Sequence, residues 1–256
     1  MYHRDFTQKY LIGIFAAFQI VQSASFAGES NIIADSGKSH VQLVELFSSE
    51  SCSSCPPADK WISNLKDKAK LWKNFVPVVF HVDYWNYLDW KDGFSSHAMT
   101  QRQVDLAHHW VSGGGVYTPS FIVDGKEWRN WRDSKDFEIP TNSKNQEGLQ
   151  LIVSRKTKNV FSVSIQGKSA DKKYVVRLAQ LGFNIQTDVK SGENSGKILK
   201  HNFVVLNWSS KNLELQKKEL EFYLEEPTQK TTRVAIAAWI EEDGNPTPLQ
   251  ATGAFL

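Results

Sequence analysis

Two cysteines separated by two residues are the sharpest chemical feature of the sequence. Cys52-Ser53-Ser54-Cys55 is a C-x-x-C motif, and it holds both cysteines of the 256-residue chain. At a helix N-terminus, unpaired backbone N–H groups and the helix dipole stabilise a thiolate and lower the pKa of the thiol. A second cysteine one turn later can release a captured substrate by attacking the mixed disulfide. The motif therefore indicates thiol–disulfide exchange, with Cys52 as the attacking thiol and Cys55 as the resolving thiol.

A structural disulfide and a metal site are the alternatives to redox chemistry. A bridge that closes a four-residue loop restrains the unfolded chain little, so stability is a poor reason for the motif. Zinc would need two further ligands, for which the candidates are His81, His97, His108 and His109. Because the sequence has no second C-x-x-C and no H-x₃-H motif, we assign no metal ligands and expect no cofactor.

The elements around the motif must place it between a strand and a helix. Residues 41–47 (VQLVELF) alternate in polarity and predict a strand. Residues 58–71 carry apolar side chains at helical spacings and predict a helix. Pro56 and Pro57 suit the first turn of that helix, where proline loses no hydrogen bond. Residues 76–82 (VPVVFHV) then predict a buried strand.

The start of the chain predicts export. Arg4 and Lys9 precede an apolar run over residues 11–21, and small residues follow as far as Ala27. That order is typical of a secretory signal peptide, so we expect residues 1–27 to be removed, with an uncleaved anchor as the alternative. The mature protein is then expected to be periplasmic or secreted, without stable membrane insertion.

The overall charge argues against nucleic acid as the main partner. Thirty Lys and Arg residues against 28 Asp and Glu residues leave a net charge of +2, and no face of the protein is obviously basic.

The sequence pattern changes near residue 145, where residues 140–147 form a polar linker. Beyond the linker, strands recur at about 8–12 residues with turns between them, which is typical of a β-sandwich or a barrel.

Several motifs together resemble the exported thioredoxin-like proteins grouped as domain-of-unknown-function family 1223. They are VELFSSESCSSCPPADKWISNL, HVDYWNYLDWKD, RQ at 102–103, GVYTPSFIVDGKEW and SGENSGKILKHNFVV. The resemblance implies an α/β fold class, with a thioredoxin-like domain over residues 38–140 followed by a β-rich, sandwich-like domain over residues 146–256. It implies no established reaction, because the function of that family is not settled.

The resemblance also implies roles for residues beyond the cysteines. Thr118 and Pro119 would form a cis-proline element that faces the dithiol and binds the substrate backbone; cis is the rarer form, at about 5–6% of X–Pro bonds. Glu45 lies seven residues before Cys52. A buried carboxylate there could accept the proton of the resolving thiol, and a salt-bridged or edge glutamate is the alternative.

Further residues admit both a functional and a structural interpretation. The aromatic stretch over residues 83–90 would form either a wall of a substrate groove or part of the core. Asp59 is expected to be a favourable first-turn charge, and the histidines at 97, 108 and 109 to be solvated.

Two functional hypotheses follow. The first is an exported thiol–disulfide oxidoreductase that acts on a protein thiol or disulfide, with the direction of exchange open. The second is a non-catalytic envelope binding protein whose disulfide is structural or vestigial. The first hypothesis requires an accessible Cys52 with a lowered pKa.

Overall fold

The computed structural model describes residues 1, 31–109, 115–134, 138–140, 148–167 and 171–256. Residues 2–27 of the predicted signal peptide and residues 141–147 of the predicted linker therefore lie outside the described residues. None of the described helices is long and apolar enough to cross a membrane.

Strands dominate the described part of the chain and form three sheets. An eight-stranded sheet has the order β14-β13-β8-β11-β3-β2-β4-β5, a four-stranded sheet has the order β1-β6-β7-β12, and β9 pairs with β10. The strands are β1 Asn31–Asp35, β2 Gln42–Ser48, β3 Phe75–His81, β4 Ser120–Val123, β5 Lys126–Glu127, β6 Gln150–Arg155, β7 Val160–Gln166, β8 Tyr174–Phe183, β9 Ile185–Asp188, β10 Ile198–His201, β11 Val204–Leu213, β12 Glu219–Tyr223, β13 Arg233–Glu242 and β14 Asn245–Phe255.

The α/β fold class predicted from the sequence is wrong. The structure is mostly β, with 44% strand and 13% helix, and an α/β thioredoxin-like fold is not what it shows. Its two α-helices in the described residues are α1 (Pro56–Ser63) and α2 (His97–Ala107). The helix expected over 58–71 ends early, because Asn64–Asp67 form a 3₁₀ helix and Lys68 is extended. Long strands from the second half of the chain instead enlarge the sheet that holds β2 and β3.

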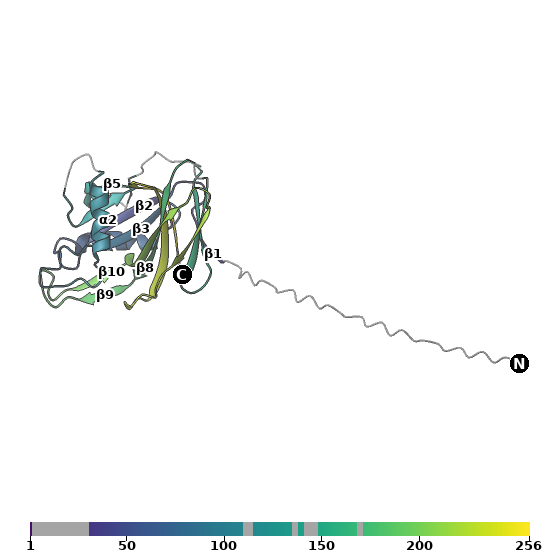
Figure 1. The fold of residues 1–256 in the computed structure, drawn as a ribbon. Helices are drawn as coiled ribbons and strands as arrows, with labels where there is room; N and C mark the ends of the chain where they lie inside the picture. The colour runs from purple at the N-terminus through teal and green to yellow at the C-terminus, as the bar shows by residue number, and fades with distance from the viewer. Residues whose placement is uncertain (2–30, 110–114, 135–137, 141–147, 168–170) are drawn as a thin grey trace.

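The eight-stranded sheet joins strands from both halves of the chain. β2 pairs in parallel with β3, from Gln42 opposite Phe75 to Ser48 opposite His81. β11 meets β3 in parallel at Val204 and Val79, and it runs antiparallel to β8 over most of its length. Figure 1 labels β2, β3 and β8 of this sheet. The division into domains over residues 38–140 and 146–256 stays a prediction.

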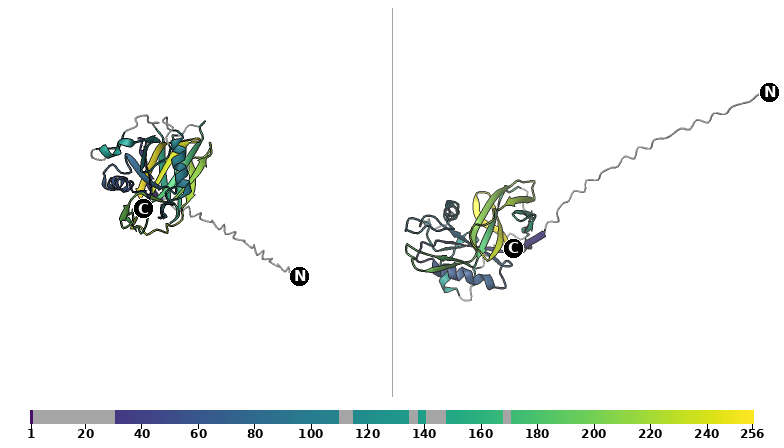
Figure 2. Two further views of the ribbon diagram at one scale, coloured as in Figure 1. Left: turned by 90° about the vertical axis from the view of Figure 1, so that its left-hand side faces the viewer. Right: turned by 90° about the horizontal axis from the view of Figure 1, so that it is seen from below.

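Two apolar cores lie on the sheets. In the first core, side chains of β2 and β3 pack against those of α1 and α2. Large aromatic side chains fill this core, among them Phe47, Phe80 and Trp239. The second core packs the four-stranded sheet against β8 and β13, through residues such as Phe161 and Phe222. Figure 2 shows the helices on the side of the molecule away from the four-stranded sheet. β2 and β3 are buried along their whole length, as expected of strands covered on both faces.

A two-stranded arm extends from the large sheet. β9 and β10 pair antiparallel, from Asp188 opposite Ile198 to Ile185 opposite His201, and residues 189–197 connect them. Figure 1 shows the arm at the lower edge of the molecule, below β3. This arm, residues 185–201, brings a segment of the second half of the chain to the loop that follows β2.

Candidate functional site

The C-x-x-C motif lies in the loop between β2 and α1, as the sequence predicts. β2 ends at Ser48, and Cys55 is the N-cap residue of α1. Pro56 and Pro57 occupy the first turn of the helix, where proline removes no needed hydrogen bond. Both cysteines are in the thiol form. Their thiols therefore lie at the N-terminal end of α1, whose dipole favours negative charge there.

The surroundings of Cys52 stabilise its thiolate. A hydrogen bond from the Cys55 thiol is the largest influence and lowers the pKa of Cys52 to about 6, although burial opposes the shift. The Ser54 hydroxyl lies 3.2 Å from the Cys52 sulfur and lowers the pKa further. Reactive cysteines have pKa values of about 3.5–7.5, so Cys52 is suited to act as a nucleophile at neutral pH.

Cys55 has the opposite character. Its side chain is fully buried, and this burial raises the pKa of the Cys55 thiol well above its ordinary value. The neighbouring Cys52 and the negative charge of Asp59 raise it further. The two thiols are therefore unequal: Cys52 is poised to ionise, while Cys55 holds its proton and donates a hydrogen bond.

The structure brings Thr118 and Pro119 to the dithiol. The Thr118–Pro119 peptide bond is cis and directly precedes β4. The Cys52 thiol donates to the Thr118 carbonyl oxygen over 3.9 Å. The Trp85 indole N–H donates to the Thr118 hydroxyl over 2.7 Å, and the Gln103 amide donates to the Tyr117 carbonyl over 2.7 Å. These contacts hold the segment before β4 against the motif.

Access to Cys52 is restricted. Cys52 is 4% exposed, whereas the neighbouring Ser53 and Ser54 are exposed. The arm lies against the motif, because Glu193 accepts a hydrogen bond from the Ser53 backbone N–H over 3.0 Å. The Asn194 amide donates to the carbonyl oxygens of Glu50 at 2.8 Å and Cys52 at 3.0 Å. The accessibility that the oxidoreductase hypothesis requires is therefore small in this conformation.

Glu45 lies in a buried ion pair. Its carboxylate accepts from Arg102 Nε at 2.9 Å and from Arg102 Nη2 at 3.3 Å, and Arg102 Nη1 lies 2.7 Å from Glu241. Burial raises the pKa of Glu45, while Arg102 lowers it. No hydrogen bond joins Glu45 to either cysteine in the described part of the chain. This geometry is that of the salt-bridged glutamate, and proton transfer by Glu45 stays a prediction.

A comparison with protein families shows to which family the chain belongs. Residues 43–241 match the family described as "Protein of unknown function (DUF1223)". The chain belongs to the DUF1223 family. The match confirms the family predicted from the sequence motifs, and it does not extend to the exported or thioredoxin-like parts of that prediction. No curated protein matches the chain at a significant level.

Two solved structures resemble this DUF1223 chain. A protein of Agrobacterium tumefaciens, AGR_C_4864, is 23% identical with a TM-score of 0.55, and the match covers 84% of this chain and 95% of that one. HBP35 of Porphyromonas gingivalis is 14% identical with a TM-score of 0.50, over 85% of this chain and 75% of that one. At these identities the likeness shows the fold alone.

Some aromatic side chains over residues 83–90 of this DUF1223 protein pack against the core, and others are exposed. Tyr84 and Trp85 are partly buried against the first core, while Tyr87 is 72% exposed and stacks on Trp85. Trp90 donates its indole N–H to Glu50 over 2.9 Å. Tyr84 donates to Gln103 over 3.2 Å, and its pKa is raised mainly by burial. The stretch therefore serves the core and also lines the surface near the motif.

Asp59, His81 and His201 form a buried cluster, of which the sequence indicated only His81, as a candidate zinc ligand beside the cysteines. One ligand atom from each lies within 4.8 Å of the others. Asp92 raises the pKa of His81 to about 9, against the effect of burial. Burial raises the pKa of Asp59. Asp59 lies in the first turn of α1, as expected, and its side chain is buried. His201 belongs to a strand far along the chain, so no local spacing connects the three.

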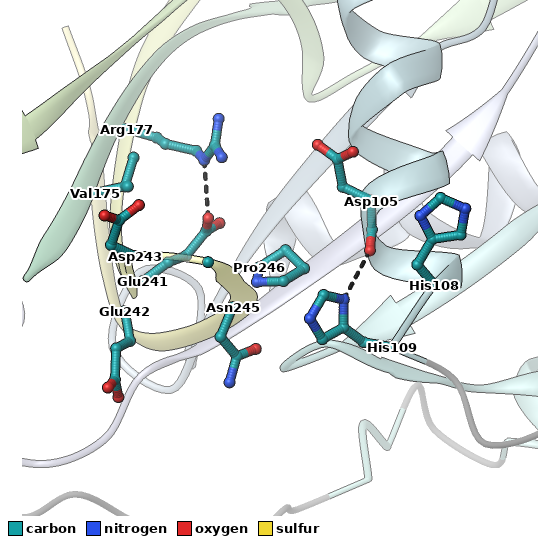
Figure 3. Close-up of a pocket in the computed structure, with 11 residues that line it drawn as sticks. Asp105, His108, His109, Val175, Arg177, Glu241, Glu242, Asp243, Asn245 and Pro246 are labelled. Atoms are coloured by element: carbon teal, nitrogen blue, oxygen red, sulfur yellow. Dashed lines mark hydrogen bonds and ion pairs between the residues drawn. The ribbon is translucent and has the colours of Figure 1, made fainter.

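A separate pocket of about 310 Å³ lies between α2 and the β13–β14 turn. Figure 3 shows His108 and His109 on one side, and Glu241, Glu242 and Asp243 on the other. His109 Nδ1 bonds the Asp105 carbonyl oxygen at 2.9 Å, and Arg177 donates to Glu241 at 3.0 Å. Neither cysteine lines this pocket. His108 and His109 are exposed, as the sequence predicts.

Proposed function

We propose that the protein exchanges thiols and disulfides with a protein substrate through Cys52 and Cys55. The observation that carries this proposal is the inequality of the two thiols beside the Thr118 carbonyl. Cys52 has a pKa of about 6 and touches Thr118, whereas Cys55 is fully buried with a raised pKa. A structural disulfide would require no such division between a thiolate and a protonated neighbour.

The exchange has two steps. The Cys52 thiolate attacks one sulfur of a substrate disulfide, so that a Cys52–substrate disulfide forms, the substrate bond breaks and the other substrate sulfur leaves as a thiolate. Cys55 then attacks Cys52, its proton passing to the departing substrate sulfur, and the Cys52–Cys55 disulfide forms. Two electrons move from the dithiol to the substrate, and the reverse sequence oxidises a substrate dithiol.

A protein substrate would need to approach beside Thr118 and the exposed serines of the motif. The Thr118 carbonyl accepts from the Cys52 sulfur and is a backbone group beside it, which suits this segment to meet an extended substrate backbone. The arm must shift to widen the path to Cys52, since Asn194 and Glu193 bind the motif backbone. Periplasmic or secreted placement would supply disulfide substrates, because disulfides persist in oxidising compartments.

The proposal is tested by disulfide transfer. The reduced protein is mixed with a reporter protein that carries an accessible disulfide, and the oxidised protein with a reduced, unfolded reporter; transfer is followed by mass spectrometry of trapped thiols. We expect transfer in at least one direction, and a loss of at least 100-fold in Cys52→Ser. Ser210→Ala is the control, because its exposed side chain lies on β11 and not at the motif, and it should retain the wild-type rate.

An absence of transfer in both directions by folded wild-type protein would overturn the proposal. A binding protein with a structural disulfide would then remain as the function to examine.

A further inference from the structure

We propose that Asp59, His81 and His201 bind a divalent transition-metal ion of the zinc type. The three residues come from α1, β3 and β10, and their side chains are each at least nine-tenths buried. One carboxylate and two imidazoles are a donor set that zinc accepts, with a fourth position left for water.

Each histidine is oriented by a carboxylate on its outer side. His81 Nδ1 lies 2.7 Å from Asp92 Oδ2, and His201 Nε2 lies 3.1 Å from Glu50 Oε1. A metal ion binds the neutral ring, in which each of these nitrogens keeps its proton in the hydrogen bond to the carboxylate and the other nitrogen carries a lone pair. Binding would therefore release the second proton of a protonated ring. This carboxylate–histidine arrangement is the usual outer partner of a histidine that binds a metal.

The two remaining imidazole nitrogens are buried and have no hydrogen-bond partner among the described residues. They are His81 Nε2 and His201 Nδ1. A buried polar atom without a partner costs about 1–3 kcal/mol, so two such atoms in one cluster demand a physical reason. A metal ion would provide a partner for both nitrogens at once.

The charges of the cluster also favour a cation. Glu50, Asp59 and Asp92 bring three buried carboxyl groups to two imidazoles. Asp59 accepts one hydrogen bond, from the Ser48 hydroxyl at 2.9 Å. Buried carboxylates are stable when they are paired or coordinate a metal, and a divalent cation would supply the positive charge centrally.

The spacing of the donor atoms is close to that of a metal site. The three atoms lie within 4.8 Å of one another. Tetrahedral bonds of about 2.0–2.2 Å place ligand atoms about 3.4 Å apart, so binding would draw these side chains inward by about 1.4 Å or less. The bound ion would tie the arm, through His201, to β3 and to the helix that begins at the dithiol.

Because zinc also binds thiolates, the test removes the thiols first. The Cys52→Ser/Cys55→Ser double variant is freed of metal with a chelator and titrated with Zn²⁺ by calorimetry and with Co²⁺ by absorption spectroscopy. We expect one ion per chain, a Co²⁺ spectrum without sulfur-to-metal charge transfer, and a higher unfolding temperature with Zn²⁺. These readouts are independent of thiol exchange, so the two proposals can fail separately.

Variants in the same background locate the ion. His201→Ala should lower the affinity for Zn²⁺ at least 100-fold, and His97→Ala on the exposed face of α2 should leave it unchanged. Asp92→Asn, which weakens the orienting contact to His81, should lower the affinity about 10–100-fold. Circular dichroism of each metal-free variant shows whether it is folded.

Three results would overturn the proposal. They are no binding of Zn²⁺ to the folded double variant, no Co²⁺ absorption spectrum in the double variant, and undiminished binding by His201→Ala. If His201→Ala does not fold, nuclear magnetic resonance of the double variant decides the matter, because Zn²⁺ must shift the ring signals of His81 and His201 and leave those of His97 in place.

Discussion

The dithiol loop and the buried polar cluster beneath it are built in different ways, although they share α1 and the arm. The arm holds the loop by hydrogen bonds to its backbone, such as those from Asn194 to the carbonyls of Glu50 and Cys52, and the loop reaches the surface at Ser53. The cluster is held by charged pairs, such as His81 with Asp92, whose side chains are completely buried. Hydrogen bonds at an exposed edge can open and close, whereas buried charged pairs fix one arrangement.

This difference suits the two regions to different tasks. A nucleophilic thiol must meet a large partner, so weak contacts over Cys52 are an advantage. Glu50 connects the regions, since its side chain binds His201 and Trp90 while its carbonyl binds Asn194. We therefore expect substitutions in the cluster to affect stability, and substitutions in the loop to affect reactivity.

Asp92→Ala tests the cluster with the largest expected effect. Asp92 accepts from His81 and from the backbone N–H groups of Glu50 at 2.8 Å and Phe94 at 2.9 Å, and the alanine leaves these groups without that partner. Breaking a buried pair of this kind costs about 3–5 kcal/mol. Urea denaturation should show this loss. A loss below about 1 kcal/mol would mean that the cluster is not the rigid region.

Cys55→Ala tests the inequality of the thiols. The Cys55 thiol is the largest cause of the lowered Cys52 pKa, so its removal should raise that pKa by about 1 unit or more. The rate of alkylation of Cys52, measured against pH, should then reach half of its maximum at a correspondingly higher pH. An unchanged midpoint would show that the partner thiol does not stabilise the thiolate.

Asn194→Ala tests the hold of the arm on the loop. The substitution removes two hydrogen bonds to the motif backbone, each of which contributes about 1 kcal/mol. We expect the limiting rate of Cys52 alkylation at high pH to rise several-fold, while Lys200→Ala on the exposed side of the arm leaves it unchanged. A rate that does not rise would show that the arm does not restrict access.

Ser54→Ala has the smallest expected effect. The Ser54 hydroxyl contributes less to the lowered Cys52 pKa than Cys55 does, so the alkylation midpoint should rise by less than it does in Cys55→Ala. Ser53→Ala is the control and should leave the midpoint in place. A larger shift in the control than in Ser54→Ala would contradict the assignment of the contact at 3.2 Å.

The same contrast explains what the sequence could predict. The strand, the C-x-x-C motif and the start of α1 are contiguous, so spacing and composition identified them together. The cluster joins positions 59, 81 and 201, and only the long-range pairing of the sheet places them side by side. The sequence around His81 or His201 contains no local pattern that distinguishes a metal-binding histidine from a solvated or a core histidine.

The fold class failed for a related reason. Alternating strands predicted the β-rich character of residues 146–256, but the order of strands in a sheet is a long-range property. β11 inserts between β8 and β3, which makes one large sheet from both halves of the chain. Glu45 shows the same limit, because its partner Arg102 lies on α2 and its neighbour Glu241 lies on β13.

The most direct test of the account is the ionisation of Cys52 in the reduced protein. The ultraviolet absorbance of the thiolate is followed against pH, and the signal of Cys52→Ser is subtracted. The lowered pKa predicts that the thiolate forms as the pH rises, with a midpoint at about 6. A midpoint at about 8.5, the pKa of an ordinary cysteine, would contradict the account.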